Sequence, residues 1–176
     1  MTDTLTKEHR SYVMSRIRSR DTKPEKVVRS YLFSRGLRFR VNVRNLPGHP
    51  DVVLAKYRAI VEIRGCFWHR HPGCATATTP KSHIRFWREK FKRNVARDKR
   101  HEAEWAAAGW RLFVVWECEL APKVRAATLE KLYGAIVSGT AYAATDAAYT
   151  LPEAAEDAVL LAAEEAAHYD AHSPPR

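Results

Sequence analysis

PDVVLAKYRAIVEIR occupies residues 50–64 and contains two apolar runs joined by a short polar turn. The runs Asp51–Leu54 and Ala59–Arg64 have the length and the β-branched content of strands. The residues between them can close a hairpin. We therefore expect two antiparallel strands to lie side by side in a sheet at this point of the chain.

The hairpin gathers charged side chains at one end. An even-numbered turn sets Asp51 opposite Glu62, with Cβ atoms roughly 5 Å apart, and Arg64 shares that face because alternate residues of a strand point the same way. Two carboxylates can hold Mg²⁺, and a nearby cation can stabilise charge that develops on a phosphate. The pattern is close to the PD-(D/E)xK nuclease signature, with Arg for Lys. There are two alternatives to a metal site. Glu62 and Arg64 can form an ion pair on a solvated face, or an odd-numbered turn can put Glu62 on the other face of the hairpin.

The rest of the chain predicts helices and two further strands around the hairpin. Thr22 can cap a helix that has Pro24 in its first turn, Glu25 in a capping box and Gly36 near its end. The other expected elements are a helix at 6–20, a strand at 37–43, a long helix capped by Ser82 and ending near Ala108, a strand at 110–117 and a helix at 122–138. This order predicts an α/β fold with a mixed central sheet flanked by helices.

Charge is distributed unevenly along the 176 residues, which carry a net charge of +10. Residues 1–120 are strongly basic, whereas residues 121–176 are net acidic. We expect a domain at 1–138, followed at 139–176 by an Ala-rich linker and an acidic helix. A basic domain indicates a polyanionic partner, although a basic composition can also serve solubility alone.

Apolar runs are short throughout, and none approaches the roughly 18 to 20 residues that cross a bilayer. The N-terminal residues MTDTLTKEHR lack the apolar core of a secretory signal. We therefore expect a cytoplasmic protein without membrane contact. The odd number of cysteines, three, argues against a disulfide framework.

GCFWHRHPGC, at residues 65–74, places two thiols, two histidines and two aromatic side chains in one irregular loop. Aromatic residues in a loop often belong to a core. Beside a candidate nuclease centre in a basic protein, they can also stack or wedge between base pairs.

These motifs together resemble the very short patch repair (Vsr) DNA mismatch endonucleases, bacterial nickases with a restriction-endonuclease-like fold. The resemblance runs from about Arg10 to about Leu120. Its ordered matches are MSRIRSRDTKPE, GLRFRVN, LPGHPD, GCFWH, FW-EK, NVARD and GWRLFVVWEC. Residues 121–176 lie mostly outside it.

The resemblance implies a catalytic centre. The family's Mg²⁺-binding aspartate corresponds to Asp51 and its catalytic histidine to His69, while the aspartate that supports a histidine or the water network corresponds to Asp98. A glutamate near the centre corresponds to Glu25. Part of the magnesium coordination comes from a backbone carbonyl, here that of Ile63. Glu25 can instead be only a capping residue, and Asp98 only a surface residue of a charged helix.

A structural zinc is also implied, held by Cys66, His71, Cys74 and Cys118. Three thiolates and one imidazole form a closed tetrahedral set with no open position for catalysis. The alternative is three reduced, buried cysteines.

DNA contacts follow from the same resemblance. Phe67, Trp68 and Trp87 match the family's intercalating wedge, and Met14 matches a residue inserted from the opposite groove; Trp87 can instead be a core residue. Candidate phosphate contacts, which supply affinity without specificity, are Lys90, Lys92, Arg93, Arg97, Lys99 and Arg100.

One position departs from the family. Arg64 stands where family members have His or Asp before the glycine of GCFWH. Either Arg64 stabilises the phosphate while His69 carries proton transfer, or Glu62 enters the site and restores a carboxylate pair; lower activity is a third outcome.

The resemblance implies a Mg²⁺-dependent DNA mismatch endonuclease that nicks 5′ of the thymine in a T·G mismatch, the product of 5-methylcytosine deamination. It would act as a monomer in the bacterial nucleoid, with a DNA cytosine methyltransferase and mismatch-repair proteins as partners. The alternatives are a restriction-like nuclease without mismatch selectivity and a catalytically impaired, zinc-stabilised DNA-binding protein.

Overall fold

The computed structural model describes residues 6–16 and 20–140. The first helix, α1, covers Lys7–Arg16, within the helix expected at 6–20. The side chain of Met14 and residues 141–176, with most of the expected acidic tail, lie outside the described residues. No described helix is both long and apolar enough to cross a membrane.

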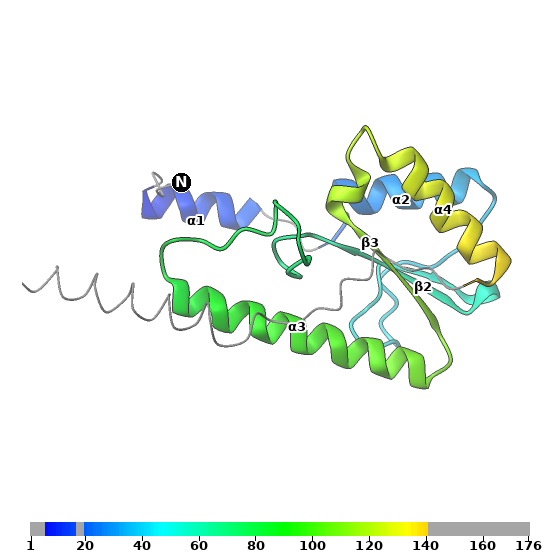
Figure 1. Cartoon of the computed structure of the whole chain (residues 1–176). Coiled ribbons are helices and arrows are strands. Elements are labelled where there is room, and N and C mark those ends of the chain that lie inside the picture. The colour runs from blue at the N-terminus through cyan, green and yellow to red at the C-terminus, as the bar shows by residue number, and fades with distance from the viewer. Residues whose placement is uncertain (1–5, 17–19, 141–176) are drawn as a thin grey trace, which may run out of the picture. The chain divides into compact units, whose positions relative to one another are not determined.

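Three strands form a mixed sheet in the order β1-β2-β3 (Figure 1). They cover Val52–Leu54, Ala59–Arg64 and Arg111–Trp116. β1 and β2 are antiparallel, whereas β2 and β3 are parallel. Val52 pairs with Val61, which confirms the even-numbered turn expected from the sequence. The 3-10 turn Ala55–Tyr57 makes this connection.

Helices cover the two faces of the sheet (Figure 1). α2 (Lys23–Ser34) and α4 (Arg125–Ser138) share a core with one face, and the long α3 (Ile84–Ala107) packs its buried Trp105 with Val53 and Ile60 on the other. Apolar side chains alternate between the two faces of β2, so each layer of helices buries its own set. The result is a small α/β domain of three layers.

The cap of α2 forms as expected. The Thr22 hydroxyl accepts a hydrogen bond from the Glu25 backbone N–H, and Pro24 lies in the first turn. Gly36 follows the helix with a φ of 81°, a left-handed conformation that favours glycine. These local signals place Glu25 at the start of α2, near the end of the sheet where β1 begins.

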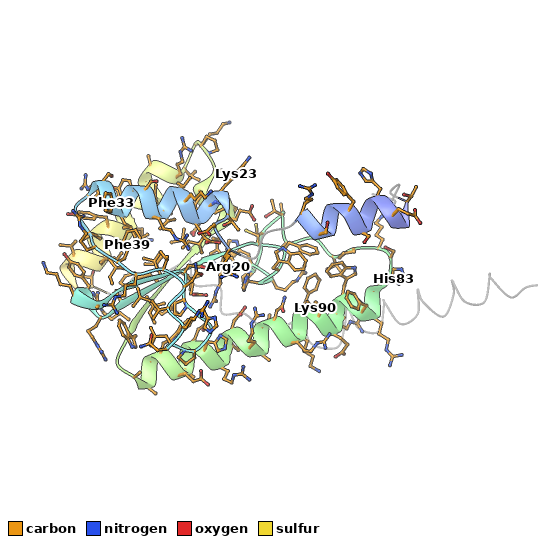
Figure 2. The ribbon with its side chains drawn as sticks, turned by 180° about the vertical axis from the view of Figure 1, so that it is seen from behind. Arg20, Lys23, Phe33, Phe39, His83 and Lys90 are labelled. Carbon is orange, nitrogen blue, oxygen red and sulfur yellow. The ribbon has the colours of Figure 1, made fainter. Side chains whose placement is uncertain are left out.

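Three expected boundaries are wrong. Within residues 37–43 only Arg40 pairs with a strand, at Val53, because Asn42 has a φ of 48° and turns the chain away. Ser82 does not cap α3; His83 takes the N-cap position in a left-handed conformation, and Figure 2 shows His83 at the end of this helix, with Lys90 farther along it. α4 begins at Arg125 rather than at residue 122, after the 3-10 turn Glu117–Leu120.

Candidate active site and metal centre

A cleft of about 1100 Å³ opens where α2 begins, β2 ends and α3 passes beneath the sheet. Nine of the predicted site residues line it together, although they come from four separate segments of the chain. These are Glu25, Asp51, Glu62, Ile63, Trp68, His69, Lys90, Arg97 and Asp98.

The two carboxylates of the hairpin meet at the wall of this cleft. The Ile63 backbone N–H donates to Asp51 Oδ2 at 2.8 Å, and the Asp51 backbone N–H donates to Glu62 Oε1 at 3.4 Å. Burial raises the pKa of Asp51 to about 6 and that of Glu62 to about 8, and the Asp51 charge adds to the rise at Glu62. Two buried carboxyl groups this close keep a proton unless a cation compensates their charge.

Pro50 explains why a backbone carbonyl is available beside them. Val52 pairs with Val61, so the next residues to exchange ladder hydrogen bonds would be Pro50 and Ile63. Proline has no N–H, so it cannot donate to the Ile63 carbonyl, while the Ile63 N–H is taken by the Asp51 side chain. Carboxylate and carbonyl oxygens are the donors that Mg²⁺ prefers, so this end of the hairpin fits a hard divalent cation.

His69 and Asp98 form a second pair in the cleft. His69 Nδ1 and Asp98 Oδ2 are 2.6 Å apart, and the Arg97 guanidinium donates to the other Asp98 oxygen. Burial alone would raise the pKa of Asp98, but the hydrogen bonds of His69 and Arg97 and the charges of His69 and Arg64 lower it below its usual value. An ionised Asp98 fixes the ring through Nδ1, which leaves Nε2 to exchange a proton.

Glu25 has a structural role and a place in the cleft. Its carboxylate accepts hydrogen bonds from the Asp21 N–H, the Thr22 hydroxyl and Arg29, so it helps to close the start of α2 through the Asp21 N–H, where a capping box would use the N–H of Thr22. It also lines the cleft with Asp51, whose pKa its charge raises. Arg29 links the two residues, because it donates to the Glu25 carboxylate and to the Asp51 backbone carbonyl at 3.2 Å.

Arg64 is held away from the cleft. Its side chain is 9% exposed, and Nη1 lies 2.6 Å from Glu102 Oε1 on α3. Arg64 is absent from the described residues that line the cleft, although its charge lowers the pKa of Glu62 and of Asp98. A direct contact between Arg64 and a phosphate would require the pair with Glu102 to open.

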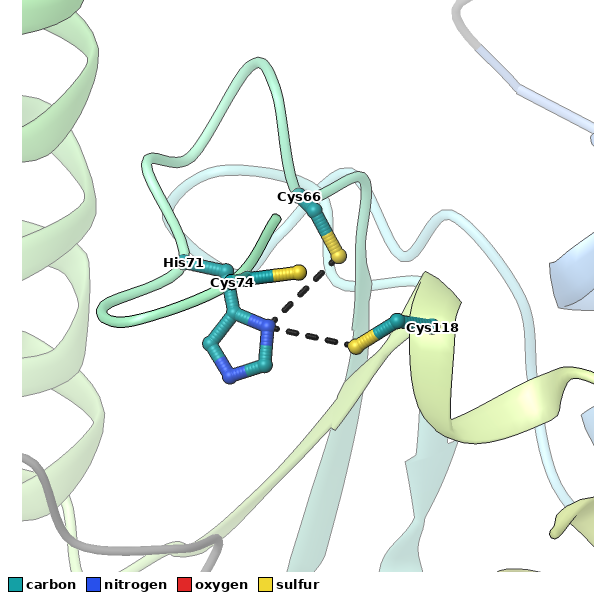
Figure 3. Close-up of side chains that lie close together, drawn as sticks. All are labelled: Cys66, His71, Cys74 and Cys118. Carbon is teal, nitrogen blue, oxygen red and sulfur yellow. Dashed lines mark hydrogen bonds between the residues drawn. The ribbon is translucent and has the colours of Figure 1, made fainter. Parts of the chain in front are cut away.

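The Cys/His cluster assembles beside the site (Figure 3). The ligand atoms of Cys66, His71, Cys74 and Cys118 all lie within 4.8 Å of one another. His71 Nδ1 is 3.6 Å from Cys66 Sγ and 3.3 Å from Cys118 Sγ. Zn–S bonds of about 2.3 Å and Zn–N bonds of about 2.0 Å put tetrahedral donors roughly 3.5 to 3.8 Å apart, so the spacing fits a metal ion.

The His71 ring is held in place by packing. It stacks on Trp116 with a centroid distance of 4.1 Å and an interplanar angle of 4°. Burial lowers the pKa of His71, which favours the neutral imidazole that binds metals. The cluster ties the loop after β2 to the end of β3, where Cys118 lies in the 3-10 turn.

The three wedge candidates form one aromatic cluster. Phe67 makes edge contacts with Trp68, Trp87 and Phe91 at centroid distances of 5.0, 5.4 and 5.1 Å. Phe91 is buried, whereas the other three rings are half-buried. Trp68 also lines the cleft, and its carbonyl accepts a hydrogen bond from the buried Asn94 at 3.0 Å.

The basic residues of α3 divide into two groups. Lys90 and Arg97 line the cleft. Among the described residues, the lining of the cleft does not include the other four, Lys92, Arg93, Lys99 and Arg100.

Sequence reasoning missed three residues that position the site. Arg29 lies four residues after Glu25, a spacing that predicts an ion pair on a helix. Asn94 is a poor helix former inside a long helix, which is a weak sign of a specific contact. Glu102 carried no signal, because its pairing with Arg64 depends on how α3 is rotated against the sheet.

Comparison with known proteins identifies the family. A family model described as DNA mismatch endonuclease Vsr matches residues 2–75. The type II nicking enzyme V.XorIIP of Xanthomonas oryzae pv. oryzae is 51% identical over 120 residues, covering 68% of this chain and 88% of that enzyme. The DNA mismatch endonuclease Vsr of Escherichia coli is 43% identical over 120 residues, covering 68% of this chain and 76% of that enzyme. This chain therefore belongs to the Vsr family of DNA mismatch endonucleases.

Proposed function

We propose that this endonuclease nicks DNA on the 5′ side of the thymine in a T·G mismatch, in a reaction that requires Mg²⁺. One observation carries the proposal: the Asp51–Glu62 pair and the His69–Asp98 pair line the same cleft. The first pair supplies oxygen donors for a cation, and the second supplies a histidine with a fixed ring. Together the two pairs can stabilise charge on a phosphate and move a proton during hydrolysis of a phosphodiester.

Asp51, the carbonyl of Ile63 and Glu62 would hold the magnesium ion. It would supply a positive charge that stabilises the negative charge developing on the phosphate. Glu62 belongs in this set because the Asp51 N–H holds its carboxylate toward Asp51. This arrangement agrees with a restriction-endonuclease-like fold of the PD-(D/E)xK type, which we propose for the unit at 1–138, with 139–176 as an appendage.

His69 would move the proton. Hydrolysis adds a water oxygen to phosphorus, breaks the bond to the 3′ oxygen and leaves 3′-hydroxyl and 5′-phosphate ends. The water loses a proton and the 3′ oxygen gains one. Because Asp98 holds Nδ1 of His69, Nε2 is the ring atom that carries a proton along this path. Arg64 would act through its charge on Glu62 and Asp98.

The aromatic cluster would recognise the mismatch. Phe67, Trp68 and Trp87 would wedge into the duplex, where stacking of about 1 to 3 kcal/mol per base offsets the cost of unstacking. Met14 would enter from the opposite groove, and Lys90 and Arg93 would contact phosphates. A structural zinc held by the Cys/His cluster would keep the loop that carries the two adjacent aromatic residues in place.

A nicking assay on labelled duplexes tests the proposal. One duplex contains a T·G mismatch and its matched control contains T·A, each incubated with Mg²⁺ or with EDTA. The proposal predicts one nick, 5′ of the mismatched thymine, only with Mg²⁺. Equal nicking of both duplexes would indicate a nuclease without mismatch selectivity, and binding without nicking would indicate a DNA-binding protein that has lost catalysis.

A further inference from the structure

We infer that Arg20 and Arg44 form a binding site for a DNA backbone phosphate next to the one that is cleaved. The two arginines line a recess of about 650 Å³ together with Asn42 and His49. Gly48, Asp51 and Glu62 form the rest of its wall, so the recess lies directly beside the proposed magnesium site. This inference rests on the proposed function and adds a defined path for the nicked strand.

The first observation is that the guanidinium groups of Arg20 and Arg44 have no described binding partner. Other arginines near the site are occupied: Arg29 by Asp21 and Glu25, Arg64 by Glu102, and Arg97 by Asp98. Within the described part of the chain, neither Arg20 nor Arg44 has an ion-pair or hydrogen-bond partner. Two unpaired cations beside one recess can accept an anion without breaking an existing pair.

Both arginines are attached to fixed segments of backbone. Arg20 precedes Asp21, whose N–H donates to the buried Glu25 carboxylate at 2.9 Å. Figure 2 shows Arg20 at the end of α2 that carries Lys23, with Phe33 at the opposite end. The backbone beside Arg20 is therefore held in place before any ligand arrives, which lowers the entropic cost of binding.

The loop that carries Arg44 is pinned to α3. Trp105 Nε1 donates to the Pro47 carbonyl at 3.0 Å. Gly48 has a φ of 71° and lies so close to His101 that an added Cβ would be 2.4 Å from the ring. No other residue type fits at Gly48 without moving the ring, so glycine lets the loop approach α3 closely at the edge of the recess.

Charge selects the ligand. The two guanidinium groups in the lining favour a phosphate, which arginine can bind through two parallel hydrogen bonds. Asp51 and Glu62 line the same recess and repel an anion from their part of the wall. A phosphate in the recess is thus held against Arg20 and Arg44, and the strand that carries it continues toward the carboxylate pair.

The test measures DNA binding in EDTA, so it does not depend on nicking. Arg20→Ala and Arg44→Ala are compared with the wild type and with Arg125→Ala, which removes the same charge at an exposed position on α4. Each recess variant should reduce the slope of log affinity against log salt concentration by about 1, as expected for one lost phosphate contact. Arg125→Ala should keep the wild-type slope, and melting curves confirm that all variants fold.

A second arm locates the phosphate. Each phosphate near the nick is replaced in turn by an uncharged methylphosphonate. One replacement should weaken the wild type and leave Arg44→Ala unaffected. The inference is overturned if the recess variants have the same salt dependence of affinity as Arg125→Ala. It is also overturned if every replacement that weakens binding of the wild type weakens binding of Arg44→Ala as well. The proposed function fails separately, if the wild type does not nick the T·G duplex.

Discussion

The carboxylate centre and the Cys/His cluster are close neighbours in sequence but differ in every property that matters for a metal. Asp51 and Glu62 offer hard oxygens at the wall of a large cleft, whereas the cluster offers three sulfurs and one nitrogen within 4.8 Å. Oxygen donors with open positions suit Mg²⁺ and catalysis, and four soft donors suit zinc and structure. The difference supports our proposal that one centre performs the reaction and that the other holds the loop proposed to recognise the substrate.

Removal of the Asp51 carboxylate should have the largest effect. Asp51→Asn keeps an acceptor for the Ile63 N–H but loses the charge that holds a cation. We expect the nicking rate to fall on the order of 10³-fold or more, with DNA binding and melting temperature nearly unchanged. Mg²⁺-dependent nicking at a near-normal rate by pure Asp51→Asn would remove Asp51 from the site.

Two histidines separate the two centres most sharply, because His69 belongs to the cleft and His71 to the cluster. His69→Asn should lower the nicking rate about 10²- to 10⁴-fold, the usual contribution of an acid–base residue, with normal stability and zinc content. His71→Asn should lose zinc and destabilise the fold by more than about 2 kcal/mol. The nicking rate, the melting temperature and the zinc content are measured for both variants. If both variants change in the same way, His69 and His71 do not belong to two centres with different roles.

Trp68 tests whether the loop held by the cluster recognises the mismatch. Trp68→Ala should weaken binding to the T·G duplex by about 1 to 3 kcal/mol, which corresponds to roughly 5- to 150-fold. Binding to the matched duplex should change less, because only a wedged complex needs the ring. Equal losses on both duplexes would make Trp68 a core residue or a nonspecific contact.

The smallest expected effect is a pH dependence of stability in EDTA. The pKa of Glu62 is raised to about 8 by burial and by Asp51, so the folded protein binds a proton that the unfolded chain releases near pH 4 to 5. The free energy of unfolding should therefore decline as pH rises from about 5 to 8. Glu62→Gln removes this titration and should flatten that part of the profile. If the stability of Glu62→Gln depends on pH as steeply as that of the wild type, a group other than Glu62 is responsible for the pH dependence.

The hairpin was predictable because its signals are local. The sequence left an even-numbered or an odd-numbered turn open, and the even-numbered turn, which sets Asp51 opposite Glu62, is the one that the structure has. The contact between His69 and Asp98 came instead from the family resemblance, since no local rule connects a loop with the middle of a distant helix.

Other features depend on the tertiary structure and were mispredicted or missed. Residues 37–43 have a strand pattern, but the left-handed Asn42 allows only Arg40 to pair. One of the alternatives placed Arg64 at a phosphate, and its pairing with Glu102 in this structure was not foreseen. The rotation of a long helix on a sheet is set by packing over its whole length, and the sequence near Arg64 contains no information about it.

One measurement tests the central claim that two different metals serve two different centres. The protein is dialysed against metal-free buffer without chelator, its metal content is determined, and nicking of the T·G duplex is followed as Mg²⁺ is added. The account predicts about one zinc per chain after dialysis, no nicking until Mg²⁺ is restored, and full nicking afterwards. Folded, active protein without zinc, or nicking that needs no added Mg²⁺, would contradict it.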